Sequence, residues 1–114
     1  MTGLLDVKDK NGRSVYDMAS HEREPISFDF AADLGVGETI VSAVSVLVHR
    51  RDESAEPDAL DGAPIPSPAF PSATILTQWV KEPPIDLAGY RLTMRATTST
   101  GRIVEPELDI EVTR

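Results

Sequence analysis

The stretch Tyr90-Arg91-Leu92-Thr93-Met94-Arg95-Ala96-Thr97 decides the fold class, because large apolar or small residues alternate with polar ones along it without a break. Successive side chains of a β-strand point to opposite faces, so this pattern sets one face against a core and the other in water. The turn residues 98–101 follow, and the segment 107–112 then alternates in the same way. Together the two runs predict an antiparallel hairpin in which Arg91 and Arg95 face the acidic side of the returning strand.

Two earlier segments also have strand character. The segment 26–30 places Ile26, Phe28 and Phe30 on one face. The segment 38–49 is rich in Val and Ile on both faces, which predicts a strand covered on both sides. On that strand we expect one face to carry Ile40, Val44, Val46 and Val48, and the other to carry Val41, Ala43 and Leu47.

A fifth strand is predicted at 72–80 and is stopped by Pro83 and Pro84. In it Trp79 alternates with Ile75 and Thr77, and we expect Trp79 to be a core aromatic rather than an interface anchor. Elsewhere in the chain no stretch of helical length has a convincing period of 3.6 residues. The sequence therefore predicts an all-β protein, an antiparallel β-sandwich with several short strands.

Two segments differ from these strands. Residues 1–23 contain the turn pair Asn11-Gly12 between weakly apolar flanks, which indicates a hairpin or an arm that orders on a neighbour. Residues 50–71 hold five of the nine prolines together with acidic residues, which predicts a long extended loop without regular ladder hydrogen bonds. The expected organisation is an arm at 1–23 and one sandwich domain at 24–114 with this loop inside it.

Composition limits the function. The chain has 114 residues, no cysteine and a formal net charge of -8, from 19 acidic and 11 basic residues. Such a charge repels a phosphate backbone, so we expect no nucleic-acid partner. The lack of cysteine excludes disulfides and thiolate metal sites. The segment 1–10 contains charges and no long apolar run, so we expect neither a signal peptide nor a membrane span there.

No candidate site for chemistry stands out. His21 and His49 are the only imidazoles, and His49 precedes two arginines, which disfavours a bound cation; we expect structural or surface roles for both. The acidic residues of 52–61 lack the spacing of a calcium loop and are interrupted by proline, which favours a solvated loop. No pair of carboxylates is singled out for hydrolysis. The sequence therefore predicts no catalytic residue, no metal, no cofactor and no enzyme activity.

A family resemblance rests on the segments that surround these strands. Asp86, Ala88 and Tyr90 have the D-x-A-x-Y spacing of immunoglobulin domains, with Leu92 where the second core cysteine would be. This spacing suggests a tyrosine corner, in which the Tyr90 hydroxyl bonds to nearby backbone while the ring enters the core. The ordered set of further motifs is the strand 26–30, then Leu34 and 37–40, the strand 73–80, and the runs 88–92 and 97–102.

This set resembles the small tail-region proteins of tailed bacteriophages known as fiber-tail adaptors, over about residues 24–112. The resemblance implies an immunoglobulin-like sandwich in a virion structural protein that is made in the host cytoplasm. It also implies several copies per virion, each joining the tail or its connector ring to fibers or neighbouring subunits. The sequence departs from the family in its long Pro-rich loop and in Lys81-Glu82-Pro83-Pro84, which replaces an expected Gly-Gly.

Two other functions remain open: a capsid decoration protein, and a carbohydrate-binding or adhesion module that meets the host surface. Fold alone does not separate head from tail proteins. Phe70 lies among prolines with little domain core to enter, so it is the preferred contact residue. The predicted partner-binding residues are Leu4, Leu5, Val15, Tyr16 and Phe70.

Overall fold

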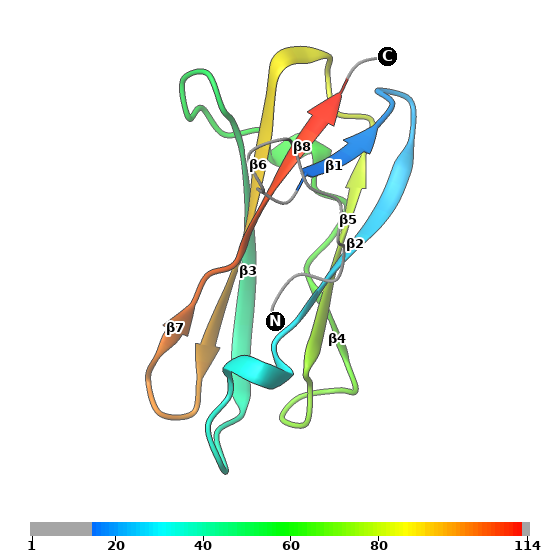
Figure 1. The fold of residues 1–114 in the computed structure, drawn as a ribbon. Coiled ribbons are helices and arrows are strands. Elements are labelled where there is room, and N and C mark those ends of the chain that lie inside the picture. The colour runs from blue at the N-terminus through cyan, green and yellow to red at the C-terminus, as the bar shows by residue number, and fades with distance from the viewer. Residues whose placement is uncertain (1–14, 113–114) are drawn as a thin grey trace.

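The computed structural model describes residues 15–112, which form two packed β-sheets (Figure 1). One sheet has the strand order β1-β8-β6-β3, with β7 also paired to β6, and the other has the order β2-β5-β4. The strands are β1 (Val15–Met18), β2 (Arg23–Asp29), β3 (Ile40–His49), β4 (Ile65–Ser67), β5 (Ile75–Lys81), β6 (Asp86–Thr98), β7 (Ile103–Val104) and β8 (Glu107–Val112).

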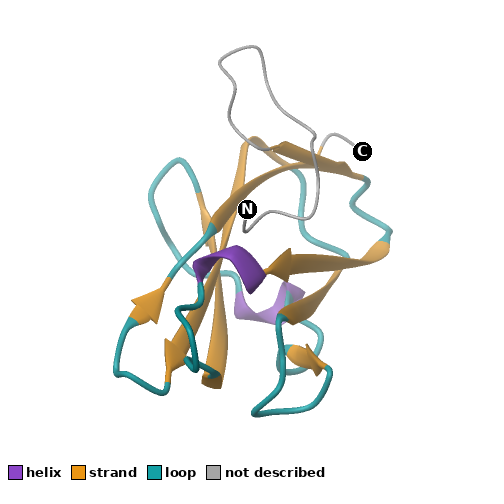
Figure 2. Ribbon diagram, turned by 60° about the horizontal axis from the view of Figure 1, so that its bottom comes forward, coloured by secondary structure: helices purple, strands orange, loops and turns teal. Residues whose placement is uncertain are grey.

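In the part of the chain that the structure describes, helical structure is confined to two single-turn 3₁₀ helices in loops, η1 (Ala31–Asp33) and η2 (Pro57–Ala59) (Figure 2). Within residues 15–112, no helix has the length and apolar character needed to cross a membrane. The predicted all-β sandwich is therefore confirmed, while its immunoglobulin-like character stays a prediction.

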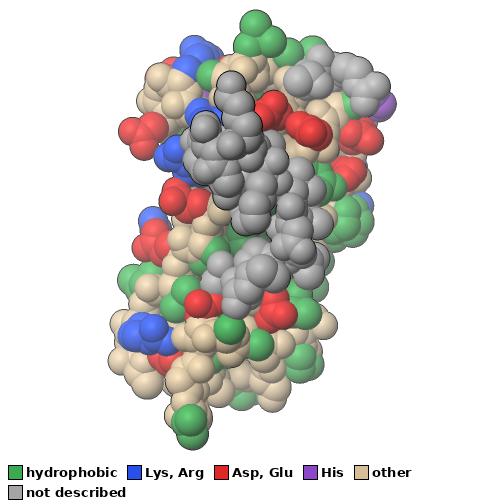
Figure 3. All heavy atoms as spheres, in the orientation of Figure 1, with side chains coloured by type: hydrophobic (Ala, Val, Ile, Leu, Met, Phe, Trp, Pro, Cys, Tyr) green, Lys and Arg blue, Asp and Glu red, His purple; other side chains and the backbone are tan. Residues whose placement is uncertain are grey.

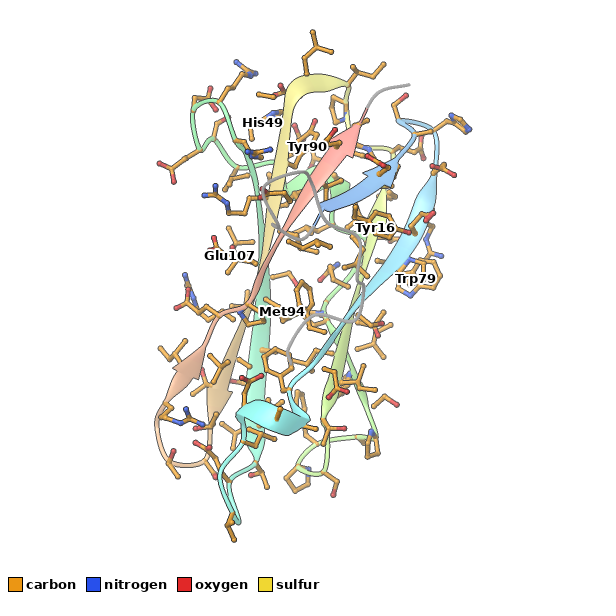
Figure 4. The ribbon with its side chains drawn as sticks, viewed as in Figure 1. Tyr16, His49, Trp79, Tyr90, Met94 and Glu107 are labelled. Atoms are coloured by element: carbon orange, nitrogen blue, oxygen red, sulfur yellow. The ribbon has the colours of Figure 1, made fainter. Side chains whose placement is uncertain are left out.

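The hairpin predicted from the alternating stretch is present. β6 and β8 pair antiparallel, with Leu92 opposite Leu108 and Arg91 opposite Asp109. The polar face carries the expected ion pairs, with 3.5 Å between Arg91 Nε and Glu107 Oε2 and 3.3 Å between Arg95 Nε and Glu105 Oε1. The other face is buried, as Figure 4 shows for Met94, which lies between the two sheets.

The core is built from the inward faces of both sheets. Complete burial of one such aliphatic or aromatic side chain contributes about 1.5–3 kcal/mol, so these residues hold the two sheets together. The largest fully buried apolar side chains are Ile26, Phe30, Ile40, Leu47, Leu76, Val80, Tyr90, Leu92, Met94, Ile110 and Val112.

The predicted faces of β3 are wrong at the start of the strand. A register shift between Ile40 and Ser42 inserts one extra residue against β6. An extra residue reverses the alternation, so Ile40 and Leu47 are buried on the same face instead of opposite ones. The outer face is not covered either, since Val44 is 50% exposed.

The Pro-rich segment 50–71 is more ordered than predicted. It contains η2 and the strand β4, which pairs antiparallel with β5 through Ile65, Pro66 and Ser67. Proline is tolerated there because β4 is an edge strand with one side free of ladder bonds. The buried Gln78 side chain also donates from Nε2 to the Gly62 carbonyl at 3.0 Å, which fixes this segment on the sandwich.

The expectation that Trp79 lies in the core is wrong. Leu76, Gln78 and Val80 occupy the inward face of β5, so Trp79 lies half-buried on the outer face of the three-stranded sheet. The Arg23 guanidinium stacks on its ring at 3.8 Å from the centroid. Such stacking covers the indole with a cation instead of a second sheet.

The first described strand is also unexpected. β1 pairs parallel with β8, so the sandwich is not purely antiparallel. A turn at 19–22, closed by the Glu22 N–H to Ala19 carbonyl bond at 3.1 Å, carries the chain from β1 to β2 in the other sheet. Because β1 does not form a hairpin with β2, it is free to lie alongside β8. Residues 15–23 therefore belong to the sandwich, and the arm or hairpin predicted at 1–23 otherwise lies outside the described residues.

Candidate interaction surfaces

The sandwich presents loops at two opposite ends. β3 and β6 run antiparallel along the molecule, and the ten residues of β3 span about 30 Å at 3.3 Å per residue. The loop 34–39 and the turn 98–102 lie at one end, which we call the η1 end. The segments 50–56 and 82–89 lie at the other end, which we call the β5–β6 end (Figure 1).

A buried carboxylate organises the η1 end. Glu38 accepts hydrogen bonds from the Thr98 hydroxyl at 2.6 Å, the Thr100 hydroxyl at 2.5 Å and the backbone N–H of Gly35 at 2.8 Å. Arg102 completes the set, with 2.5 Å from Nη2 to Oε1 and 3.0 Å from Nε to Oε2. These donors, the Arg102 guanidinium first, hold the pKa of Glu38 well below its usual range. One ionised side chain thus ties the loop before β3 to the turn after β6.

The same loop ends in a bare apolar tip. Gly35 and Gly37 flank Val36, whose side chain is fully exposed, and Gly37 has a positive φ of 75° that suits glycine. Figure 3 shows apolar atoms at the lower tip, where this loop lies in Figure 1. Glu38 anchors the base of the loop, so the tip is presented from an ordered support.

A histidine between two carboxylates organises the β5–β6 end. His49 Nδ1 lies 2.7 Å from Asp86 Oδ2, and its Nε2 lies 2.9 Å from Glu56 Oε1. Arg51 also donates to Asp86, at 2.9 Å. The hydrogen bond to Asp86, followed by that to Glu56, raises the pKa of His49, and the same His49 contact is the largest cause lowering the pKa of Asp86 to about 2. The cluster connects three separate segments of the chain.

Tyr90 supports this cluster from below. Its ring is fully buried, lies 4.7 Å from the His49 ring and tilts by 43° against it (Figure 4). Its hydroxyl donates to the Pro84 carbonyl, which is the backbone bond predicted for a tyrosine corner. Burial raises the pKa of Tyr90 to about 12, so the hydroxyl stays a donor at neutral pH. The loop between β5 and β6 is thereby held against the core.

That anchored loop and the start of β6 also carry exposed apolar side chains. Leu87 is 96% exposed and Ile85 is 55% exposed. Figure 3 shows apolar atoms at the upper tip of the molecule, where Figure 1 places this loop. Each end of the sandwich therefore presents large apolar side chains on a loop that buried polar contacts hold in place, an arrangement typical of protein contact surfaces.

The predicted contact residues are not brought together. Leu4 and Leu5 lie outside the described residues. Val15 lies in β1 opposite Asp109, and Tyr16 beside it is half-buried, packs against the core and donates its hydroxyl to Glu24. Phe70 is 39% exposed in the loop between β4 and β5, on the other sheet. Of the two whose side chains are described, Phe70 is the more available to a partner.

Sequence reasoning missed the exposed apolar residues of the two end loops, Val36, Ile85 and Leu87. A signal for each was present. Val36 stands between two glycines, with no neighbouring apolar residue to continue a strand. Ile85 and Leu87 follow two prolines and precede the regular alternation that begins at Tyr90. An apolar residue in a turn segment that lacks the alternation of a strand is not placed on the buried face of a sheet, so it is expected to be exposed.

The described part of the chain holds no group of three or more acidic or histidine side chains placed to bind a metal ion. His49 with its two carboxylates is an ion-paired cluster, in which both ring nitrogens are already occupied. Its geometry supports a structural role, since both nitrogens bond to groups of the fold.

Comparison with known families assigns the chain. Residues 18–111 match the model of the family Gp77, described as podophage GP4 fiber-tail adaptor protein gp77. The chain belongs to this family. No curated protein matches it. The matched range includes both ends of the sandwich with their exposed loops, and membership implies a phage structural protein that binds other virion proteins in the tail region. The fiber-tail adaptors are structural proteins, which is not a class of enzyme.

Proposed function

We propose that this chain is a non-enzymatic adaptor that joins the phage tail or its connector ring to fibers or to neighbouring subunits. The match over residues 18–111 carries this proposal. The protein is made in the host cytoplasm, takes its place in the tail region of the virion in several copies, and needs no cofactor. Its net charge of -8 opposes direct contact with nucleic acid.

We assign the two contacts of the adaptor to the two ends of the sandwich. Val36 at the η1 end and Leu87 with Ile85 at the β5–β6 end are separated by the length of β3. Both loops are fixed by polar networks, so little order has to be gained on binding. Phe70, 39% exposed in the loop between β4 and β5, offers a further apolar side chain to a partner. The sandwich between the ends sets the spacing of the two partners.

Cryo-electron microscopy of phage particles assembled with variant chains tests the assignment. We expect Val36→Asp and Leu87→Asp each to break one attachment, because a carboxylate replaces an apolar contact that must lose water. One variant should leave particles with the adaptor and no fibers, and the other should leave particles without the adaptor. Ala63→Asp is the matched control, since Ala63 is exposed in the segment between η2 and β4, outside both end loops.

The outcomes separate the alternatives. Density for the chain across the head would favour a decoration protein and overturn the adaptor proposal. Normal, complete particles with both end variants would leave the adaptor function standing and contradict the assignment of the two ends.

A further inference from the structure

The strand β3 has one free edge. Its other edge pairs with β6 along its whole length. On the free side, the Leu47 carbonyl accepts from the Glu56 N–H at 2.9 Å, and the His49 N–H donates to the Ser54 carbonyl at 2.8 Å. Before Leu47, no other strand of residues 15–112 pairs with this edge.

The direction of the backbone groups on the open part follows from these bonds. Leu47 and His49 turn their N–H and C=O groups to the free side, and alternation along a strand gives Ala43 and Ser45 the same direction. The open part of β3 therefore presents two donors and two acceptors in a row. Beside them, the Val44 side chain is 50% exposed on the outer face.

The other sheet edges in the described chain are either protected or very short. Natural edge strands carry charges or prolines that prevent pairing with another chain. β1 carries Asp17, β2 carries Arg23, Glu24, Pro25 and Asp29, and β4 carries Pro66. The edge strand β7 has neither a charge nor a proline, but it is only two residues long. The stretch 40–48 of β3 has no charged residue and no proline, and only the register shift between Ile40 and Ser42 limits its pairing.

We propose that the free edge of β3 pairs antiparallel with the same edge of a second copy of this chain. Among the described strands, β3 offers the one unprotected edge longer than two residues, so it is the edge through which two copies can pair over several residues. The contact is self-complementary, as a two-fold dimer requires. Because the stretch is uncharged, no like charges come face to face when it meets itself.

The limits of the open stretch define the register. The segment 54–56 covers the edge from Leu47 onward, and the register shift ends regular pairing before Ser42. Pairing over 42–46 sets Ala43 opposite Ser45 of the second copy, which makes four backbone hydrogen bonds. Val44 then faces its own equivalent across the two-fold axis, in a pair without hydrogen bonds where Cα atoms lie about 4.5 Å apart.

Such a short pairing gives a weak dimer. We expect a dissociation constant on the order of 0.1 mM, since the buried area is below that of a standard interface. Raising the salt concentration should strengthen the dimer, because it screens the repulsion between two chains of charge -8 while the contact itself contains no ion pair. This dimer is independent of the proposed adaptor function.

Sedimentation velocity of the full chain across a range of concentrations tests the proposal. Val44→Lys should weaken the dimer about tenfold or more, because two ammonium groups would stand opposite each other. Ile103→Lys is the matched control, since Ile103 is 56% exposed on β7 and away from the edge of β3. An equal mixture of Val44→Lys and Val44→Glu should recover a dimer, which a merely misfolded variant would not do.

Hydrogen exchange supplies a second readout at residue level. The amides of Ala43 and Ser45 should become protected as concentration rises, whereas that of Val44, which faces β6, should be protected throughout. A chain that stays monomeric at concentrations on the order of 1 mM would overturn the proposal. So would a dimer that Val44→Lys leaves unchanged, or one that forms without protecting these two amides.

Discussion

Gly89 lies where β6 begins its regular pairing with β8, and any side chain at this position should lower the free energy of unfolding by a measurable amount. Its φ is 80°, and a Cβ at this position would lie 2.7 Å from the carbonyl oxygen of Ile110. Gly101, in the turn after β6, has a similar φ of 87°, but a Cβ there would meet nothing within 4 Å. The two glycines therefore separate the cost of backbone conformation from the cost of a steric clash.

The magnitudes follow from this difference. An alanine in left-handed conformation costs about 1–2 kcal/mol, which applies to Gly89→Ala and Gly101→Ala alike. At Gly89 the backbone of β8 must also move away from the new methyl group, and overpacking of this kind adds about 1–3 kcal/mol. We expect Gly89→Ala to lose about 2–5 kcal/mol of unfolding free energy, and Gly101→Ala about 1–2 kcal/mol, so that the loss at Gly89 is the larger.

Urea unfolding followed by the fluorescence of Trp79 measures both variants, since Trp79 is the one tryptophan. For a domain of this size the extra loss at Gly89 lowers the melting temperature by about 4–8 °C per kcal/mol. Equal losses for the two variants would refute the reasoning, because they would mean that β8 accommodates the methyl group freely. A larger loss at Gly101 would contradict the placement of both glycines.

Two further predictions concern the β5–β6 end. The folded pKa of His49 is raised above its ordinary value of about 6.5, so its stabilisation is fully present below that pH and is lost as pH rises through the folded pKa. The urea midpoint of the natural chain should therefore fall as pH rises through the folded pKa of His49, and that of His49→Gln should change less. If the two chains show parallel pH profiles, the ion-paired cluster of His49 does not stabilise the fold. Tyr90→Phe removes the hydroxyl that donates to the Pro84 carbonyl, and it should lower the free energy of unfolding by about 1 kcal/mol in the same titration. An unchanged free energy of unfolding would contradict this, because it would mean that water replaces the hydroxyl at no cost.

Much of the fold could be predicted from the period of two. The stretch from Tyr90 to Thr97 faces the core and the solvent as the alternation requires, and the hairpin with β8 follows from it. The Tyr90 hydroxyl bond was also predictable, because the D-x-A-x-Y spacing places the ring just after a turn. In both cases neighbouring residues in the sequence determine the outcome.

The errors arose where distant parts of the chain decide. The register shift after Ile40 depends on how β3 meets β6, and the pattern of valines alone does not reveal it. Pro66 forms an edge strand because β5 supplies a partner, and Trp79 lies outside because Leu76 and Val80 already fill the core. The tip at Val36 is anchored through Glu38, whose partners Thr98 and Arg102 lie far along the chain. The tip at Leu87 is anchored through Tyr90, which packs against His49 of another strand.

The antiparallel pairing of β3 with β6 has a mechanical consequence. The loop at Val36 leads into the start of β3 at one end, and Leu87 lies at the start of β6 at the other. A pull between these two tips would draw the strands past each other along their axes. Since antiparallel ladder bonds lie perpendicular to the strands, they would be loaded together in shear rather than broken one after another. Tension along the sandwich would thus be shared by the whole ladder.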